Sequence, residues 1–239
     1  MQSRVIEVLR YGLAGLALLG SLPLRAGEID AALLVYRIET PDGESSVNRL
    51  LTTRDYLRLD QGAQDPGFIL FDRKQRKIYS VTPSDRSILV IDPPAGDPQK
   101  PDDLAIEVRR GADGDLPLVE GVKPQHWTLL ANGNSCREAD VAPGVMADAV
   151  GIYADYLRVL AAQQALALPS IPEEFRDACD SAIHVYAPDA LLRKGLPVKV
   201  WDGQGYREAL VDFRPVFSIP DDSFTLPTGF QETRMGAGS

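Results

Sequence analysis

The stretch GFILFDRKQRKIYSVTPSDRSILVID, residues 67–92, contains three short apolar runs separated by charged or proline-containing turns. The runs occupy residues 68–71, 78–81 and 88–91, and their composition and length predict three β-strands. The connections between them are short. Since a parallel pair needs a crossover of about a dozen residues or more, these strands are expected to pair antiparallel, as a meander.

Further strands are expected on both sides of this stretch. Residues 29–39 and 47–60 precede it, and residues 104–109 and 126–130 follow it. A late hairpin is predicted from residues 197–201 and 206–217, because Asp202-Gly203 supplies the turn between them. The chain is therefore dominated by strands that pair with their neighbours.

One long helix is predicted over residues 145–166. Its apolar residues recur at helical spacing, while its charged residues mark a solvent side. Pro169 ends it, and Ser170 with Glu173 forms a capping-box pattern that predicts a second, shorter helix through Cys179. The apolar set is Met146, Ala149, Val150, Ile152, Tyr153, Tyr156, Leu157 and Leu160, and the charged set is Asp148, Asp155 and Arg158.

The runs 68–71 and 88–91 are apolar on both faces, so something must cover the second face of their sheet. The long helix is the expected cover. We predict an α+β fold in which a curved antiparallel β-sheet, a half-barrel, has its concave face covered by one long and one short helix. Residues 27–239 are expected to form a single domain with a proline- and glycine-rich acidic insertion at about 93–124.

The first 26 residues have the pattern of a secretory signal peptide. Arg4 and Arg10 precede the uncharged run 11–24, and Ala26 is a small residue at the expected cleavage site. The run is shorter than the roughly 20 residues that a membrane span needs, and a buried N-terminal helix is the alternative. We expect a periplasmic protein, exported with cleavage near Ala26 and without stable membrane insertion afterwards.

The charge balance argues against nucleic acid as a partner. Removing three arginines and one glutamate with residues 1–26 from 25 basic and 34 acidic residues leaves 22 and 33, a net charge of −11. Such a surface repels phosphate backbones and anionic headgroups. The basic residues 73–77 lie between two apolar runs, which favours a solvated hairpin tip over a docking loop.

Cys136 and Cys179 are the two cysteines of the chain, and in an exported protein they are expected to form a disulfide. A reactive thiol or a metal pair is the alternative. His126 and His184 are the two histidines, and neither has metal-ligand spacing from a cysteine. The spacing therefore favours a structural bridge.

The sequence contains none of the local motifs that carry common chemistries, such as G-x-S-x-G, a glycine-rich phosphate loop, H-E-x-x-H or C-x-x-C. Asp113 and Asp115 lack the further oxygen ligands of an EF-hand loop and predict a solvated acidic turn. Both histidines lie in apolar strings, where a hydrogen-bonded histidine is commoner than a general base. We expect no enzyme activity, no catalytic residues, no metal and no cofactor.

The order of a strand meander, a helix, a late hairpin and a closing SFTLPTGF resembles the periplasmic carrier fold of the LolA and LolB lipoprotein-localisation family. The resemblance covers residues 28–92 and 197–232, and its motif residues here are Phe71, Asp72, Lys77, Tyr79, Pro227 and Gly229. It implies a curved half-barrel whose concave face, closed by helices, holds acyl chains or apolar peptide. The insertion at 93–124 departs from the pattern of these carriers.

Two functions follow as expectations. The first is a soluble exported binding or carrier protein for a lipid, a lipoprotein acyl chain or another hydrophobic ligand. The second is an envelope interaction or assembly factor with a self-filled core, which contacts a protein partner through residues 93–124 or 73–77. Groove candidates for the first function, each of which could instead be ordinary core, are Phe68, Leu70, Tyr79, Leu89, Ile91, Tyr153 and Leu157.

Overall fold

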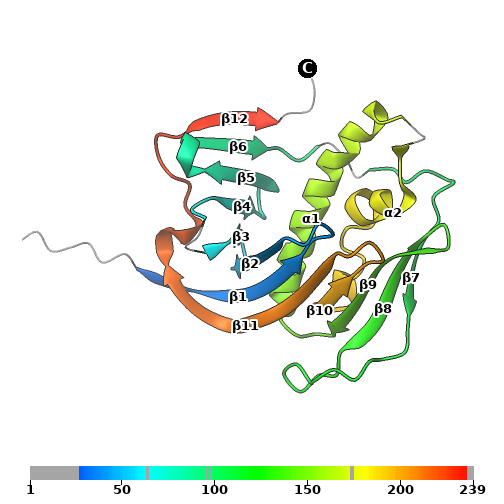
Figure 1. Cartoon of the computed structure of the whole chain (residues 1–239). Helices are drawn as coiled ribbons and strands as arrows, with labels where there is room; N and C mark the ends of the chain where they lie inside the picture. Colours follow the sequence, from blue (N-terminus) through cyan, green and yellow to red (C-terminus); the bar gives the residue numbers. More distant parts are fainter. Residues whose placement is uncertain (1–26, 63–64, 95, 97, 173–174, 236–239) are drawn as a thin grey trace, which may run out of the picture.

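The computed structural model describes residues 27–62, 65–94, 96, 98–172 and 175–235, and in it twelve strands form one open sheet (Figure 1). Their order across the sheet is β12-β6-β5-β4-β3-β2-β1-β11-β10-β9-β8-β7. The strands are β1 (Glu28–Glu39), β2 (Ser45–Thr52), β3 (Tyr56–Asp60), β4 (Phe68–Asp72), β5 (Lys77–Thr82), β6 (Ser87–Ile91), β7 (Ile106–Arg110), β8 (Gln125–Ala131), β9 (Asn134–Ala142), β10 (Leu196–Trp201), β11 (Arg207–Pro220) and β12 (Gln231–Met235).

The α+β class is confirmed, and every predicted strand region contains a strand, although the single predicted run 47–60 is divided into β2 and β3. β1 to β6 form a meander in which each strand pairs antiparallel with the next. β1 and β11 are the longest strands, and they bend through the middle of the curved sheet (Figure 1). β7, which lies inside the predicted insertion, forms one edge by pairing with β8.

The expectation of a purely antiparallel sheet is wrong at the other edge. β12 runs parallel to β6, with Gln231 opposite Ser87 and Met235 opposite Ile91. The crossover that a parallel pair needs is supplied by the long excursion of the chain between the two strands, residues 92–230.

Two strands were missed by the sequence analysis, the edge strand β12 and the inner strand β9. β9 begins directly after the turn at Asn132-Gly133, where both residues have positive φ, 50° and 82°. An Asn-Gly pair with two positive φ angles joins strands in a tight hairpin, and here it joins β8 to β9. The signal was present in the sequence, but the polar letters NSCREAD that follow it do not alternate as an amphipathic strand does.

The long helix α1 (Ala147–Ala167) packs against one face of the sheet. Phe71 of β4 and Tyr156 of the helix meet edge to face, with ring centroids 6.0 Å apart. Around this pair lies the largest apolar cluster of the protein, which joins helix residues to the inward residues of β1 to β6. Its buried members include Leu34, Tyr36, Leu50, Leu57, Phe71, Ile78, Ala149, Val150, Ile152, Ala154, Tyr156 and Val159.

The second helix differs from its prediction. Ser170 does not cap a helix, because its hydroxyl donates to the carbonyl of Ala167 inside the turn that ends α1. The short helix α2 (Ala178–Ser181) begins instead at Asp177, whose side chain accepts the backbone N–H of Asp180. The predicted partner Glu173 lies outside the described residues.

The opposite face of the sheet has its own cover. The turn η7 (Asp221–Phe224) places Phe224 against Tyr56, with ring centroids 5.9 Å apart. Leu226 and Phe230 continue this contact along the strands. Apolar residues of β4 and β6 therefore have apolar contacts on both faces, with α1 on one face and with residues 221–230 on the other.

The predicted disulfide is confirmed. Cys136 of β9 is bonded to Cys179 of α2, and their Cα atoms are 5.1 Å apart. The bridge is packed by Leu104, Ala131 and Ala182. It therefore ties the helical segment after α1 to the sheet. Within the described residues, none of the helices has both the length and the hydrophobicity of a membrane span.

Candidate functional site

A row of side chains on the face that packs against α1 remains partly exposed. Strand register places Leu59 opposite Ile69, Ile69 opposite Ser80, and Ser80 opposite Leu89. The three apolar residues of this row pack against the large α1 cluster but are not buried by it. This row is the part of the face that the helix leaves accessible.

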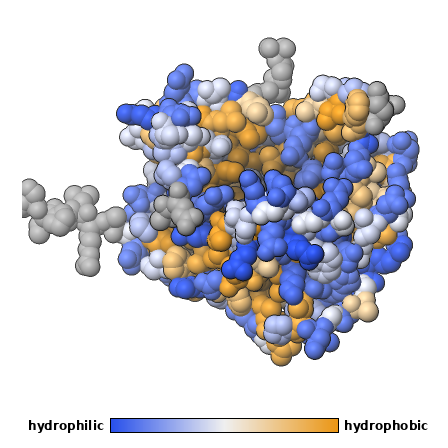
Figure 2. Space-filling model, in the orientation of Figure 1, coloured by the Kyte–Doolittle hydropathy of each residue, from blue (hydrophilic) through white to orange (hydrophobic). Residues whose placement is uncertain are grey.

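The row leads into a hollow of about 450 Å³ at the ends of β3, β4 and β5. Leu59, Ile69 and Ser80 line this hollow, and the turns at residues 65–67 and 82–84 border it. Figure 2 shows hydrophobic side chains gathered in a recess of this face of the molecule. A volume of this order lies within the roughly 300–1,000 Å³ of small-molecule pockets.

The acidic residue at the edge of this hollow is neutralised by two arginines. Asp60 accepts hydrogen bonds from Nε of Arg49 at 2.7 Å and from Nε of Arg58 at 2.9 Å. Burial acts to raise the pKa of Asp60, but the hydrogen bonds from Arg58 and Arg49 outweigh it and lower the pKa. Arg58 also lies over the Phe68 ring, 3.8 Å from its centroid. Two arginines therefore hold the Asp60 carboxylate at this edge.

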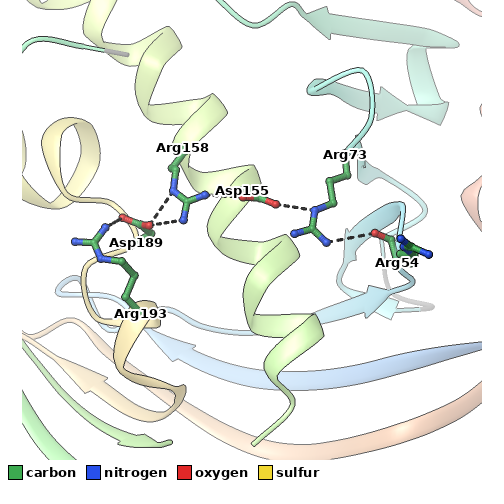
Figure 3. Close-up of polar contacts among 6 residues, drawn as sticks. All are labelled: Arg54, Arg73, Asp155, Arg158, Asp189 and Arg193. Atoms are coloured by element: carbon green, nitrogen blue, oxygen red, sulfur yellow. Dashed lines mark hydrogen bonds and ion pairs between the residues drawn. The ribbon is translucent and has the colours of Figure 1, made fainter. Parts of the chain in front are cut away.

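Ion pairs hold α1 at both sides, as Figure 3 shows. On one side Asp155 accepts from Nε of Arg73, in the turn between β4 and β5, at 2.7 Å. On the other side Nε of Arg158 donates to Asp189 at 2.8 Å, and Arg193 also pairs with Asp189. Asp148 and Arg158 are exposed, as the predicted solvent side of the helix requires, while Asp155 is partly buried; Asp155 and Arg158 also connect the helix to its neighbours.

Asp189 is the centre of this clamp. Its side chain is 3% exposed, whereas those of Arg158 and Arg193 are 46% and 55% exposed. A buried carboxylate needs such partners, because its charge is otherwise costly to desolvate. The segment 182–194, which carries Asp189, is therefore fastened to α1 by charge and to β9 by the nearby disulfide.

The structure divides the seven groove candidates between the two faces of the sheet. Leu89, Ile91, Tyr153 and Leu157 belong to the face that carries α1. Phe68, Leu70 and Tyr79 belong to the opposite face, with Phe224 and Leu226, although Phe68 also borders the hollow. Successive strand residues point to opposite faces, so these two groups cannot line one groove.

The charges of the predicted basic tip are largely paired. Arg73 binds Asp155, Lys74 binds Asp55 at 2.9 Å, and Lys77 binds Asp92 at 3.1 Å.

The two histidines and the acidic turn at Asp113 are candidate chemical groups in the sequence, and the structure shows their surroundings. His126 lies 3.1 Å from Asp140 through Nδ1 and stacks on Trp201. Burial lowers the pKa of His184, and the charge of Arg137 lowers it further. Asp113 accepts from Arg110 and from the backbone of His126.

Sequence reasoning missed Leu59 and Ile69, because both were counted as ordinary strand residues. It also missed the roles of Asp189, Arg137 and Glu208. The latter two are charged residues inside strand-forming stretches, and that is the one signal that could have marked them.

No protein-family model and no curated protein matches this chain. Two solved structures of PNGF-II, in the C2 and P21 space groups, are similar to it with a TM-score of 0.41 and identities of 11% and 9%. The similarity covers 87% and 86% of this chain. The chain spans about a third of the length of those proteins, 31% and 32%.

Proposed function

We propose that the protein is a non-catalytic, exported binding or carrier protein whose hydrophobic ligand lies along Leu59, Ile69 and Leu89. The partly exposed apolar row beside α1, continuous with the 450 Å³ hollow, is the observation that carries this proposal. A lipid or an acyl chain has the apolar, extended shape that such a row accommodates. The row contributes no polar side chain except Ser80, so apolar burial would supply the affinity.

The proposal includes the finer points of the fold and location. The curved sheet is taken as a half-barrel with α1 on its concave side, as the resemblance to LolA and LolB carriers implies. Export to the periplasm is supported by the Cys136–Cys179 disulfide, which persists in oxidising compartments. The signal pattern itself lies in residues 1–26, outside the described residues.

A binding role rather than a catalytic one is supported by the state of Asp60, the buried carboxylate at the hollow. Asp60 is held by Arg49 and Arg58, and its lowered pKa makes it a poor proton donor or acceptor near neutral pH. Its contacts are those of a structural ion pair.

The test is native mass spectrometry of the protein purified from the periplasm, with displacement of a fluorescent fatty acid as a second measurement. Wild-type protein is expected to retain lipid and to bind the probe. Ser80→Lys places a cation in the hollow without removing a core side chain, and it should weaken probe binding about tenfold or more.

The matched control is Val216→Lys, a change at a position that is 68% exposed on β11 and away from the row. It should bind as wild type does. A lipid-free spectrum together with no probe binding would contradict the proposal. Equal loss in both lysine variants would show that the loss does not come from occupancy of the hollow.

A second candidate function, an envelope interaction factor, is favoured by Leu118. This side chain is 62% exposed in the stretch between β7 and β8, while its neighbour Val119 is buried in the main cluster. A photo-crosslinking residue at position 118 should then give an adduct of one defined mass in the periplasm, and the same residue at position 216 should not. The basic tip 73–77 supports this function less, because three of its cations are paired.

A further inference from the structure

A second, smaller cavity lies between α1, the segment 182–194 and strands β8 to β11. Its volume is about 80 Å³, and most of its wall is apolar. Tyr153 and Leu157, two of the groove candidates, line it from the helix. The remaining wall is formed by Leu129, Arg137, Ile183, Ala187, Pro188, Leu191, Leu192, Pro197, Val200 and Glu208.

Arg137 has hydrogen-bonding capacity that the protein leaves unused. Its Nε is buried and has no hydrogen-bond partner. Its ion pair with Asp202 is long, 4.0 Å from the guanidinium nitrogen to Oδ2, and its guanidinium lies 4.7 Å from the centroid of the Tyr206 ring. A buried hydrogen-bond donor without an acceptor destabilises the folded protein. Arg137 could therefore bind an anionic or carbonyl oxygen of a ligand.

Glu208 lines the same cavity. Its Oε2 accepts the hydroxyl of Tyr206 at 2.8 Å, and burial raises its pKa, against the opposing effects of Tyr206 and Arg137. Between these two described residues, no ion pair within 4.0 Å joins Glu208 to Arg137, although the Arg137 charge acts on Glu208. The cavity thus presents a cation and a carboxyl group that do not satisfy each other.

The balance of charge selects the kind of ligand. A simple carboxylate would be attracted by Arg137 but opposed by Glu208 and Asp202. A simple amine would be attracted by Glu208 but opposed by Arg137. A molecule with both groups meets Arg137 with its carboxylate and Glu208 with its ammonium group, and a charge-assisted hydrogen bond forms at each end.

We propose that this cavity binds a small apolar zwitterion, such as a free aliphatic α-amino acid, with the carboxylate on Arg137 and the ammonium group on Glu208. The aliphatic side chain lies against Leu157, Leu191 and Val200. The volume limits the body to a short side chain, since about 80 Å³ is well below the size of a pocket for a drug-sized molecule. This site is separate from the row at Leu59 and Ile69.

Isothermal titration calorimetry of the wild-type protein tests the charge argument with three related compounds. L-valine carries both groups, isovalerate carries only the carboxylate, and isobutylamine carries only the amine. Valine is expected to bind at least about tenfold more tightly than either analogue, because each analogue leaves either Arg137 or Glu208 without an oppositely charged partner. Isovalerate binding as tightly as valine, or no heat with valine up to millimolar concentrations, would overturn the proposal.

Variants locate the site. Arg137→Gln and Glu208→Gln should each reduce valine affinity about tenfold or more, whereas Arg207→Gln, an exposed change beside Glu208 on β11, should leave it unchanged. Thermal unfolding of each variant checks that it is folded. The comparison of three ligands on the wild-type protein holds even if one of the variants does not fold.

The outcome is independent of the lipid proposal. Lipid retention without valine binding would remove the amino acid site and leave the carrier function. Valine binding without lipid retention would remove the carrier function and leave the amino acid site. Ser80→Lys should not change valine affinity, because Ser80 lines the other hollow.

Discussion

Asp189 shows how a single buried side chain can fix the position of a helix. Asp189→Asn keeps the shape of the side chain but removes the charge that Arg158 and Arg193 share. Breaking a fully buried pair costs roughly 3–5 kcal/mol, and the exposure of both arginines reduces this, so we expect a loss of about 2 kcal/mol in the free energy of unfolding. Urea denaturation measures it.

The control for this change is Asp212→Asn, which removes an exposed pair with Arg214 at 3.4 Å. Exposed pairs contribute little, so the control should shift the unfolding midpoint only slightly. If both variants lost the same stability, the clamp on α1 would have no special role.

His184 gives the protein a pH dependence with a defined sign. Burial and the charge of Arg137 place its pKa in the folded protein below its ordinary value of 6.5. The unfolded chain then binds the proton more readily, so the contribution of His184 to stability is present above the ordinary pKa and is lost as the pH falls toward the folded pKa. Stability should decrease more on acidification from about pH 8 to about pH 5 in the wild type than in His184→Gln.

Chemical denaturation at a series of pH values gives this difference directly. Glu208 acts in the opposite direction, because its raised pKa makes the folded protein take up a proton first. It is present in both proteins and cancels in the comparison. An identical pH dependence of wild type and variant would show that His184 titrates alike in the folded and unfolded chains.

At the scale of elements, the disulfide fastens α2 and the segment after it to β9. Cys136 and Cys179 are 43 residues apart in the sequence. Closing a loop of this length removes unfolded-state entropy that corresponds to about 4 kcal/mol in the simple model. The variant Cys136→Ala with Cys179→Ala should lose stability of this order, and wild type under reducing conditions should behave similarly. A loss below about 1 kcal/mol would mean that packing around Leu104 and Ala182 alone holds the segment.

The elements that could be predicted are those with a clear local period. The meander from β3 to β6 follows from apolar runs and short turns, and α1 follows from its helical spacing. β9 could not be predicted in the same way, because its residues are mostly polar and it is held by its place between β8 and β10. The start of α2 depends on the N-cap at Asp177. The capping-box pattern at Ser170 predicted an earlier start for this helix than the one observed.

The candidate site was harder to predict than the fold, for a geometric reason. A strand that is apolar on both sides does not indicate which side faces the helix, so Phe68 and Leu70 were grouped with Tyr153 although they lie on the other face. Buried charges such as Asp189 and Glu208 acquire their partners from segments far away in the sequence. Only the packing of whole elements brings those partners together.

At the scale of the whole molecule, α1 packs on one face of the sheet and residues 221–230 pack on the other. The edge strand β12 pairs with β6, so β6 is not an edge of the sheet. All five residues of β12 are exposed, and its contact with the core is limited to the parallel ladder with β6. Burial of this strand therefore contributes little to the folding free energy. Its role is better explained by the edge that it covers, because Ile88, Leu89, Val90 and Ile91 make β6 a strongly apolar strand.

This explanation predicts what happens when the chain is ended at Phe230. The shortened protein should lose less than about 1–2 kcal/mol in urea unfolding, since the described residues that it loses, 231–235, are all exposed. It should nevertheless self-associate, because the bared N–H and C=O groups of β6 form a template for another chain. Sedimentation velocity at increasing concentration measures the association. Arg234→Gln in the full chain removes the contact with Asp92 at 3.4 Å and keeps the strand, so it should sediment as wild type does. A shortened protein that stayed at the wild-type sedimentation coefficient would show that edge protection is not the function of β12.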